Sequence, residues 1–163
     1  MLFRSEAAHR REGQLAGAPT GFQDLDKLMG GLQSSDLIIL AGRPSMGKTA
    51  LATNIAFNAA LRIRYETDAM GRRKITDGAV VGIFSLEMSA EQLATRLLAE
   101  VTEVPSDKIR RGDVRPDDFP RFVAASQELN ALPLFIDDTP ALTVSALRTR
   151  ARRLQRKIGR AHV

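Results

Sequence analysis

The 163-residue sequence predicts an α/β fold in which a parallel sheet is flanked by helices. Three short apolar runs, at residues 37–41, 79–84 and 134–137, are each followed by a stretch with helical periodicity. Strands that alternate with helices in this way are typical of a parallel sheet with crossover connections. The length is enough for one domain to bury a core, and 44% hydrophobic with 26% charged residues is an ordinary globular composition.

The chain before the first apolar run is predicted to contain a linker and a short helix. Residues 6–19 are polar and rich in Gly and Ala, which is typical of a linker. Three apolar residues then recur at helical spacing: Phe22, Leu25 and Leu28. The pair Gly30-Gly31 ends this helix, because glycine readily takes the left-handed conformation found at helix C termini.

The first apolar run, residues 37–41, contains no polar residue and precedes a Gly-rich turn. Buried parallel strands show this pattern because helices cover both of their faces. The sequence then becomes Ala-rich and helical from Lys48 to about Leu61. Residues 62–78 are polar, charged and without periodicity, so we expect an exposed insertion there, such as a hairpin.

The second half of the chain repeats the alternation of strand and helix. Residues 79–84 and 134–137 are the second and third predicted strands. Ser89 is expected to cap a helix that runs to about Glu103, with Gln92 completing a capping box. The other predicted elements are helical: short helices at 106–111 and 117–130, and a helix capped by Thr143 that carries a basic cluster.

The net charge of +5 is a feature of the C-terminal end. Residues 148–157 hold six basic residues and no acidic one, and Arg4 and Arg160 add two more, so residues 6–147 carry a net charge of −3. The absence of cysteine excludes disulfides, thiolate nucleophiles and Cys-based zinc sites. Two histidines do not supply a His-rich metal site, and no apolar run approaches the roughly 20 residues that span a bilayer, so no membrane partner is expected.

Both termini resemble remnants of a sequencing adapter. The tail, residues 158–163, back-translates to ATC GGA AGA GCA CAC GTC, and the head, residues 1–5, to GTG CTC TTC CGA TCT with GTG as start codon. The head is then the reverse complement of AGATCGGAAGAGCAC, which is the end of the Lys157 codon followed by the start of the tail. We therefore expect residues 6–157 to be an internal gene fragment between two scars. Natural termini are the alternative, and the nucleotide sequence distinguishes the two.

A Gly-rich phosphate-binding loop is predicted between the first strand and its helix. Its residues, which fit G-x-x-x-x-G-K-[ST] at every fixed position, are Gly42, Arg43, Pro44, Ser45, Met46, Gly47, Lys48 and Thr49. The two glycines allow backbone N–H groups to wrap a phosphate, and the helix N terminus favours the anion. Lys48 is placed to reach the β- and γ-phosphates, and the Thr49 hydroxyl to ligate Mg²⁺. The sequence thus predicts a site for ATP and Mg²⁺.

Carboxylates follow both later strands, on the side of a parallel sheet where ligands bind. Glu87 is a candidate to orient and deprotonate the water that attacks the γ-phosphate. The alternative for Glu87 is a first-turn glutamate favoured by the helix dipole. Asp137 ends a strand that resembles a Mg²⁺-binding strand. The alternative there, which we favour, is that Asp138 stabilises the turn at Thr139-Pro140.

With these residues identified, the chain resembles the ATPase domain of the bacterial replicative DNA helicases, the DnaB family. The resemblance covers nearly all of residues 17–157. Its most specific parts are Arg-Pro-Ser-Met inside the phosphate loop and Ser-Leu-Glu-Met after the next strand. The other matching segments are residues 19–22, Leu25-Asp26, Gly31-Leu32, Gln92-Leu93, residues 135–140 and the Arg-rich helix.

The resemblance implies a RecA-like fold, a homo-hexameric ring with ATP bound between subunits, and 5′→3′ movement along single-stranded DNA at the replication fork. It implies that Lys48 and Thr49 contact the phosphates and Mg²⁺, and that Glu87 is the catalytic base. Because the Mg²⁺-binding strand of the family follows the Arg-rich helix, Asp137 is not expected to be that ligand. Primase, a helicase loader and a bacterial cytoplasmic, nucleoid-associated location are implied as well.

The family pattern also implies that parts are missing, because the sequence ends where the Mg²⁺-binding strand is expected. We therefore expect residues 20–157 to be the N-terminal part of a RecA-like ATPase domain, incomplete at its C terminus. The DNA-binding loops, sensor residues, arginine finger and N-terminal domain are absent from the sequence. The chain by itself is accordingly expected to be inactive as a motor.

Alternative functions are a motor-inactive nucleotide-binding or interaction fragment, another RecA-type ATPase, and a small-molecule P-loop kinase, which does not explain Ser-Leu-Glu-Met. For the basic helix, contact with DNA phosphates is one interpretation, and a solvated or intersubunit face, which we favour, is the other.

Overall fold

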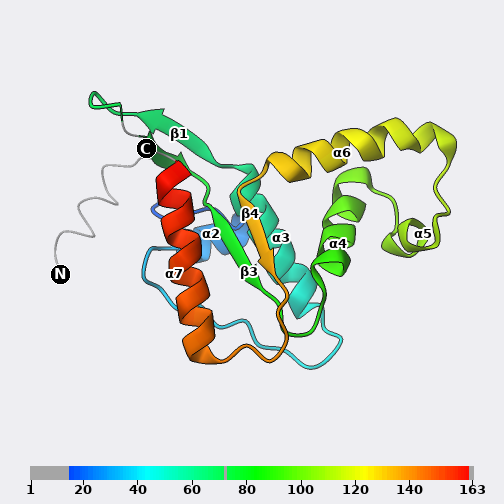
Figure 1. The fold of residues 1–163 in the computed structure, drawn as a ribbon, viewed down its shortest axis with the longest axis horizontal. Helices are drawn as coiled ribbons and strands as arrows, with labels where there is room; N and C mark the ends of the chain where they lie inside the picture. Colours follow the sequence, from blue (N-terminus) through cyan, green and yellow to red (C-terminus); the bar gives the residue numbers. More distant parts are fainter. Residues whose placement is uncertain (1–14, 72, 162–163) are drawn as a thin grey trace. The chain divides into compact units, whose positions relative to one another are not determined.

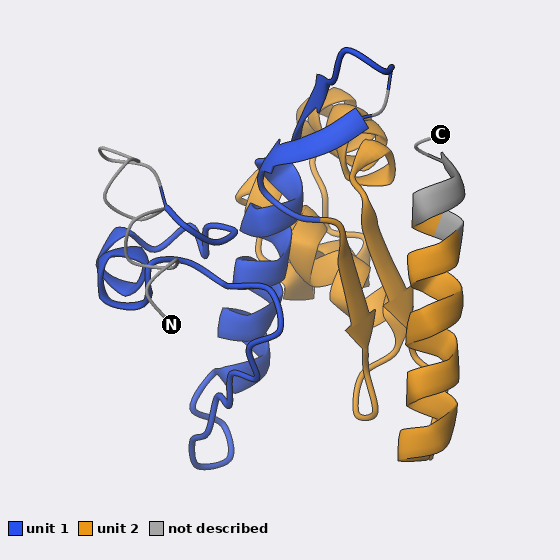
Figure 2. Cartoon of the chain, turned by 90° about the vertical axis from the view of Figure 1, so that its left-hand side faces the viewer, with its two compact units in different colours: residues 1–79 blue, residues 80–163 orange. Residues whose placement is uncertain are grey.

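The computed structural model describes residues 15–71 and 73–161 (Figure 1). The chain divides into two compact units, residues 1–79 and 80–163, each described below by itself (Figure 2). The predicted scar at residues 1–5, much of the predicted linker and the last two residues lie outside the described part. No helix in the described ranges is long and apolar enough to cross a membrane.

In the first unit, helix α2 spans Gln23–Met29 and ends at Gly30, as predicted. Gly30 takes the left-handed conformation with φ of 71°, and its N–H donates to the carbonyl oxygen of Asp26. The buried residue of α2 is Asp26, whose carboxylate accepts a 2.7 Å hydrogen bond from the backbone N–H of Thr20. The apolar spacing therefore predicted the helix correctly. It did not predict that Asp26 is the buried side chain of the helix, since Leu28 is 86% exposed.

Helix α3 spans Lys48–Leu61 and supplies much of the buried surface of this unit. Its buried residues are Thr53, Phe57, Ala59 and Ala60. The side-chain amide of Asn58 donates to the carbonyl oxygen of Thr20 over 3.1 Å, which ties the segment before α2 to α3. This contact is non-local, and it fixes the helix whose N terminus follows the phosphate-binding loop.

A β-hairpin follows α3, as expected for residues 62–78. Strands β1 (Arg64–Thr67) and β2 (Arg73–Asp77) pair antiparallel. The guanidinium of Arg73 lies 5.3 Å from the centroid of the Tyr65 ring, a cation–π distance. Most hairpin residues are exposed, so this segment contributes little to the core.

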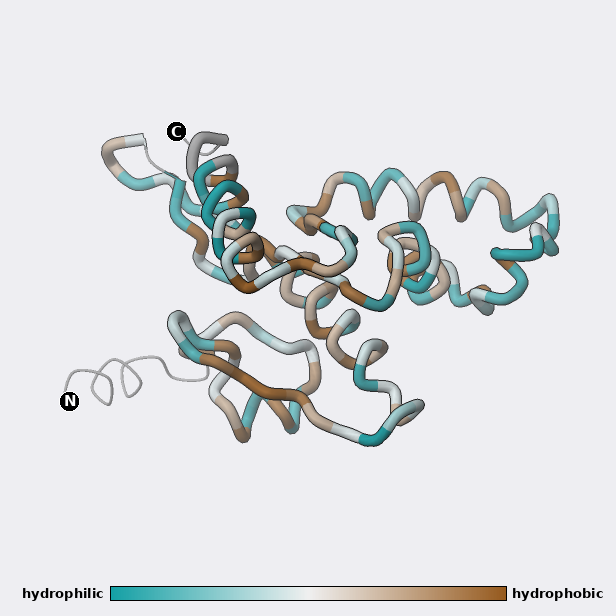
Figure 3. Tube along the Cα trace, turned by 60° about the horizontal axis from the view of Figure 1, so that its bottom comes forward, coloured by the Kyte–Doolittle hydropathy of each residue, from teal (hydrophilic) through white to brown (hydrophobic). Residues whose placement is uncertain are grey.

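The run at residues 37–41 is not a strand, which makes the prediction of a buried strand there wrong. Its side chains are exposed, with Leu37 at 87% and Ile39 at 80%. Figure 3 shows the hydropathy along the trace, with this run as a hydrophobic stretch. A strand exists only through hydrogen bonds to a neighbouring strand. Residues 37–41 belong to no strand in the described part of the chain.

The second unit contains the parallel pair that was predicted. Strand β3 spans Val81–Phe84, and strand β4 spans Leu134–Asp137. Their register pairs Val81 with Leu134 and Phe84 with Asp137. The pairing continues beyond the strands, because the N–H of Ser85 donates to the carbonyl oxygen of Asp137 over 2.9 Å. The C-terminal ends of both strands therefore lie side by side.

Helices occupy the rest of the second unit, at the predicted places. They are α4 (Ala90–Thr102), α5 (Ser106–Arg111), the 3₁₀ helix η1 (Pro116–Asp118), α6 (Phe119–Ala131) and α7 (Val144–Ala161). Leu93 and Leu97 of α4 are buried and form a core with Ala125 of α6. Helix α7 packs on β3, where Gly82 leaves room for Leu154. Helices that connect and cover two parallel strands confirm the α/β class.

The N terminus of α4 offers a direct test of the capping box. The Ser89 hydroxyl accepts from the N–H of Gln92 over 3.2 Å, and the Gln92 side chain accepts from the N–H of Ser89 over 3.1 Å. We expect Ser89→Ala to lower the free energy of unfolding by about 1 kcal/mol, because the N–H of Gln92 loses its acceptor at the helix end. Urea denaturation measures the change. Ser89→Thr is the control, and equal stability of all three proteins would contradict the prediction.

Candidate functional site

The predicted phosphate-binding loop lies in the first unit as a turn that leads into α3. The N–H of Met46 donates to the carbonyl oxygen of Arg43 over 3.3 Å and closes this turn. Ser45 and Gly47 both have positive φ values, 64° and 81°. Left-handed residues within a tight turn bring backbone N–H groups to one side, where they form a concavity for anions. Seven of the eight predicted loop residues are exposed, and Thr49 is half-buried.

The N terminus of α3 directly follows this turn and is open to an anion. Gly47 occupies the N-cap position, and no side chain caps the helix. The first turn of α3 contains no acidic residue. The first N–H groups of a helix have no intrahelical acceptor, and the helix dipole adds a partial positive charge there. The loop and the helix end together have the geometry that binds phosphate groups.

Lys48 lies at the start of α3 with its side-chain stem against the loop. A Cβ built on Gly42 would be 3.4 Å from the Lys48 Cγ and 3.7 Å from its Cδ. These are ordinary van der Waals distances, so the lysine stem runs alongside Gly42. In the described part of the chain, Lys48 makes no hydrogen bond or ion pair, and its side chain is exposed. Its ammonium group is free to bind an anionic ligand.

Thr49 has the chemistry expected of the Mg²⁺ contact. Its carbonyl oxygen accepts a 2.7 Å hydrogen bond from the Thr53 hydroxyl. Its own hydroxyl has no hydrogen-bond partner within the described residues. A half-buried, unpaired hydroxyl beside the predicted phosphate-binding turn fits the threonine that ligates Mg²⁺ in P-loop proteins. No group of three or more His, Asp or Glu side chains in the described ranges is arranged to hold a metal by itself.

Glu87 lies in the second unit, in a bend between β3 and α4. The Ser85 hydroxyl holds this bend: it donates to the carbonyl oxygen of Met88 over 2.6 Å and accepts from the Met88 N–H over 3.1 Å. Glu87 precedes the N-cap Ser89 and is exposed, whereas the acidic residue of the first turn of α4 is Glu91. The alternative of a first-turn glutamate is therefore wrong. Glu87 has no hydrogen bond or ion pair among the described residues.

Asp137, at the end of β4, is engaged on both carboxylate oxygens. One oxygen accepts from the Thr139 hydroxyl over 2.7 Å and from the Thr139 N–H over 3.1 Å. The other accepts from the Arg150 guanidinium over 2.7 Å. The turn is thus stabilised by Asp137, and the expectation that Asp138 stabilises it is wrong. Asp138 instead accepts a 2.8 Å hydrogen bond from the N–H of Ala90, at the start of α4.

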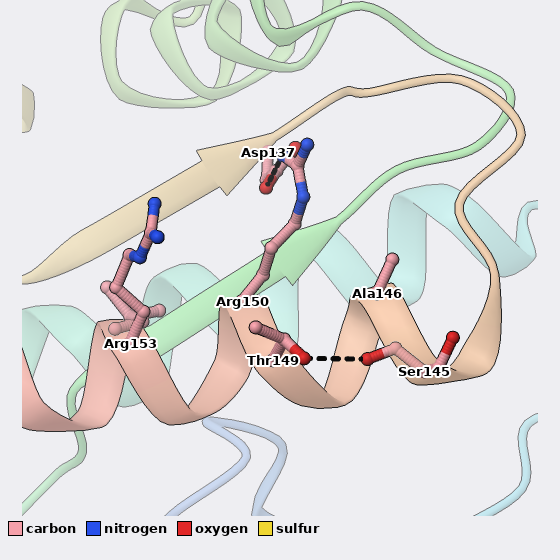
Figure 4. A pocket seen from close by; sticks show the side chains of 7 residues that line it. Asp137, Ser145, Ala146, Thr149, Arg150 and Arg153 are labelled. Atoms are coloured by element: carbon pink, nitrogen blue, oxygen red, sulfur yellow. Dashed lines mark hydrogen bonds and ion pairs between the residues drawn. The ribbon is translucent and has the colours of Figure 1, made fainter.

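Arg150, which contacts Asp137, is a residue that the sequence alone did not single out. It projects from α7 toward the end of β4, thirteen positions after Asp137 (Figure 4). The basic cluster marked this helix, but nothing in the sequence distinguishes Arg150 from the arginines beside it. The distinction arises because α7 packs on β3 through Leu154, one helical turn after Arg150. That packing directs Arg150 toward the strand ends.

The Asp137 contacts predict a specific pH dependence. The Arg150 guanidinium, with the hydroxyl and N–H of Thr139, lowers the pKa of Asp137 from 3.8 to about 2. A carboxylate whose pKa is lowered by folding stabilises the fold at pH values above its pKa in the unfolded chain. This stabilisation is lost as the pH falls through the pKa of the group in the folded protein. We expect the stability difference between wild type and Asp137→Asn to be constant above about pH 5 and to be lost as the pH falls through about 2. Urea titrations across this range measure it, and a pH-independent difference would contradict the assignment.

The chain is similar in sequence to a known protein family. The sequence profile of the DnaB-like helicase C-terminal domain matches residues 17–163. Replicative DNA helicase DnaB of Rickettsia conorii is 47% identical over 150 residues, which is 92% of this chain and 30% of that protein. Replicative DNA helicase DnaB of Geobacillus stearothermophilus is 41% identical over 154 residues, 94% of this chain and 31% of that protein. The chain thus spans about 30% of the length of these curated relatives.

Two solved structures share the fold. The first, an ATPase domain, superposes with a TM-score of 0.77 at 27% identity, covering 96% of this chain and 50% of that one. The second, the structure of a DnaB-like replicative helicase and its interactions with primase, superposes with a TM-score of 0.76 at 27% identity. The match covers 96% of this chain and 34% of that one. These similarities confirm the RecA-like fold that the resemblance implied. This chain belongs to the DnaB-like helicase C-terminal domain family.

Proposed function

We propose that this chain carries the nucleotide-binding part of an ATP-dependent replicative DNA helicase. The observation that supports this most strongly is the uncapped N terminus of α3 behind the turn that contains Ser45 and Gly47. Membership in the DnaB-like family supplies the reaction class, since the curated relatives are named replicative DNA helicases. ATP is the proposed ligand, with Mg²⁺ bound to its phosphates.

Three side chains have proposed roles in ATP hydrolysis. Lys48 binds the β- and γ-phosphates, and the Thr49 hydroxyl ligates Mg²⁺. Glu87 orients and deprotonates the attacking water, a role supported by its exposed position after β3 and its lack of a competing partner among the described residues. Asp137 is assigned no metal role, because Arg150 and Thr139 already engage both of its oxygens.

The proposed partners follow from the family. We propose that the whole helicase is a homo-hexamer that unwinds duplex DNA at the fork by moving 5′→3′ on single strands. Primase is a proposed partner, supported by the solved helicase structure that describes such interactions. A helicase loader and a location in the bacterial cytoplasm at the nucleoid belong to the same proposal.

For the 163-residue chain by itself, we expect nucleotide binding without DNA-stimulated turnover. A helicase site formed between subunits needs groups from two chains, and this chain spans about 30% of its curated relatives. A phosphate-release assay with and without single-stranded oligonucleotide measures turnover, with Lys48→Ala as the background control. DNA-stimulated turnover that disappears in Lys48→Ala would contradict the expectation and assign motor chemistry to this segment alone.

A further inference from the structure

We propose that Arg150 and Asp138 are positioning residues that hold the Glu87 loop, defined here as residues 85–89, in one conformation. The inference rests on the proposed role of Glu87 as catalytic base. Neither residue belongs to the phosphate-binding loop, and Arg150 lies on a helix far along the sequence. The argument is a chain of hydrogen bonds within the second unit.

Both ends of the Glu87 loop are bound to the same turn. At the first end, the N–H of Ser85 donates to the carbonyl oxygen of Asp137 over 2.9 Å. At the other end, the N–H of Ala90 donates to the Asp138 carboxylate over 2.8 Å. Inside the loop, the Ser85 hydroxyl bridges the N–H and carbonyl groups of Met88. The position of Glu87 therefore depends on the conformation of the two aspartates.

Arg150 holds the turn that contains Asp137 and Thr139 in its conformation. One guanidinium nitrogen of Arg150 donates to Asp137 over 2.7 Å and to the Thr139 hydroxyl over 2.8 Å. The Thr139 hydroxyl donates to the other Asp137 oxygen over 2.7 Å, which closes a three-residue ring of hydrogen bonds. Charged hydrogen bonds that are mutually satisfied reinforce one another when partly shielded from water. The Asp137 side chain is 26% exposed, so it is partly shielded.

The ring of hydrogen bonds connects α7 to the turn that binds the Glu87 loop. Arg150 and Leu154 lie one turn apart on α7, and Leu154 packs against β3 at Gly82. Strand β3 leads directly into the Glu87 loop. The helix is thus attached both to the strand before the loop and to the turn that binds the ends of the loop. A change in the orientation of α7 is expected to move Glu87 through these two attachments.

Amide hydrogen exchange of the 163-residue chain tests the proposal without requiring hydrolysis. We expect Arg150→Ala and Thr139→Val to speed exchange at the amides of Ser85 and Ala90 by about tenfold, because the turn that accepts from them loses its support. Thr139→Ser keeps the hydroxyl and is expected to stay within about twofold of wild type. Arg156→Ala removes the same charge from an exposed position of α7 and is the matched control.

The amides of Leu93 and Leu97 separate positioning from general destabilisation, because they lie in the buried part of α4. The proposal predicts that their exchange is unchanged in all four variants. Unchanged exchange at Ser85 and Ala90 in Arg150→Ala would overturn it. A uniform increase that includes Leu97, or an equal effect of Arg156→Ala, would also overturn it.

Two further measurements keep the proposal separate from the proposed function. A carbon-13 NMR titration of Asp137 is expected to give a pKa of about 2 in wild type, returning toward 3.8 in Arg150→Ala but not in Arg156→Ala. An unchanged Asp137 pKa in Arg150→Ala would contradict the ring of hydrogen bonds. Affinity for MgATPγS is expected to be equal in wild type and Arg150→Ala. Failure of wild type to bind MgATPγS would contradict the proposed function, while the exchange results would still decide the positioning role.

Discussion

Replacing Lys48 by alanine is expected to weaken binding of MgATP to this chain by about 10- to 100-fold. The ammonium group has no partner in the described part of the protein, so the substitution removes a phosphate contact without breaking a contact that holds the fold. A charge-assisted hydrogen bond of this kind contributes about 1.5–3 kcal/mol, which corresponds to that range of affinity. Isothermal titration calorimetry with MgATPγS measures the change.

Lys108→Ala is the matched control for this experiment. Lys108 is exposed and lies on α5 in the other unit, and its removal changes the net charge equally. The control is expected to bind as wild type does, and both variants are expected to keep the wild-type melting temperature. Wild-type affinity in Lys48→Ala, or an equal loss in both variants, would show that Lys48 does not contact the phosphates.

Ile39→Lys is expected to weaken self-association of the chain by about tenfold or more. The run at residues 37–40 exposes four consecutive apolar side chains, of which Ile39 is 80% exposed. An unpaired apolar segment with high β-propensity is a site for pairing between copies. Burial of one isoleucine side chain is worth about 1.5–3 kcal/mol, and a charge at its place opposes the pairing. Light scattering after size-exclusion chromatography across a concentration series measures the association.

Leu28→Lys provides the comparison, because Leu28 is 86% exposed but lies on α2 outside the run. This substitution introduces the same charge and is expected to leave self-association nearly unchanged. If both variants associate as wild type does, the run is not the contact between copies. If both dissociate equally, the effect belongs to net charge and not to the segment.

The elements that the sequence predicts correctly are those whose signals are local. The capping box needs only Ser89 and Gln92, and both of its hydrogen bonds are present. Gly30 ends α2 because of its own backbone freedom. The turn before α3 and the open helix end that follows Gly47 are likewise fixed by contiguous residues, and phosphate binding at this turn stays a prediction.

The features that the sequence does not predict depend on distant residues. The run at residues 37–41 has the composition of a strand but is not one in the structure, because a strand forms only through hydrogen bonds to a neighbouring segment, which composition does not encode. The exchange of roles between Asp137 and Asp138 depends on which groups approach them, Arg150 in one case and the N terminus of α4 in the other. Adjacent aspartates are chemically identical, so only the three-dimensional arrangement separates them.

Nuclear magnetic resonance titration of the 163-residue chain with MgATPγS tests most directly that residues 42–49 form the nucleotide site. We expect saturable shifts concentrated at the loop amides and at the first turn of α3, and their loss in Lys48→Ala. The Lys108→Ala variant is expected to give the wild-type pattern. Shifts centred elsewhere, for example on the basic residues of α7, or no saturable shift in wild type, would contradict the assignment of the phosphate-binding loop.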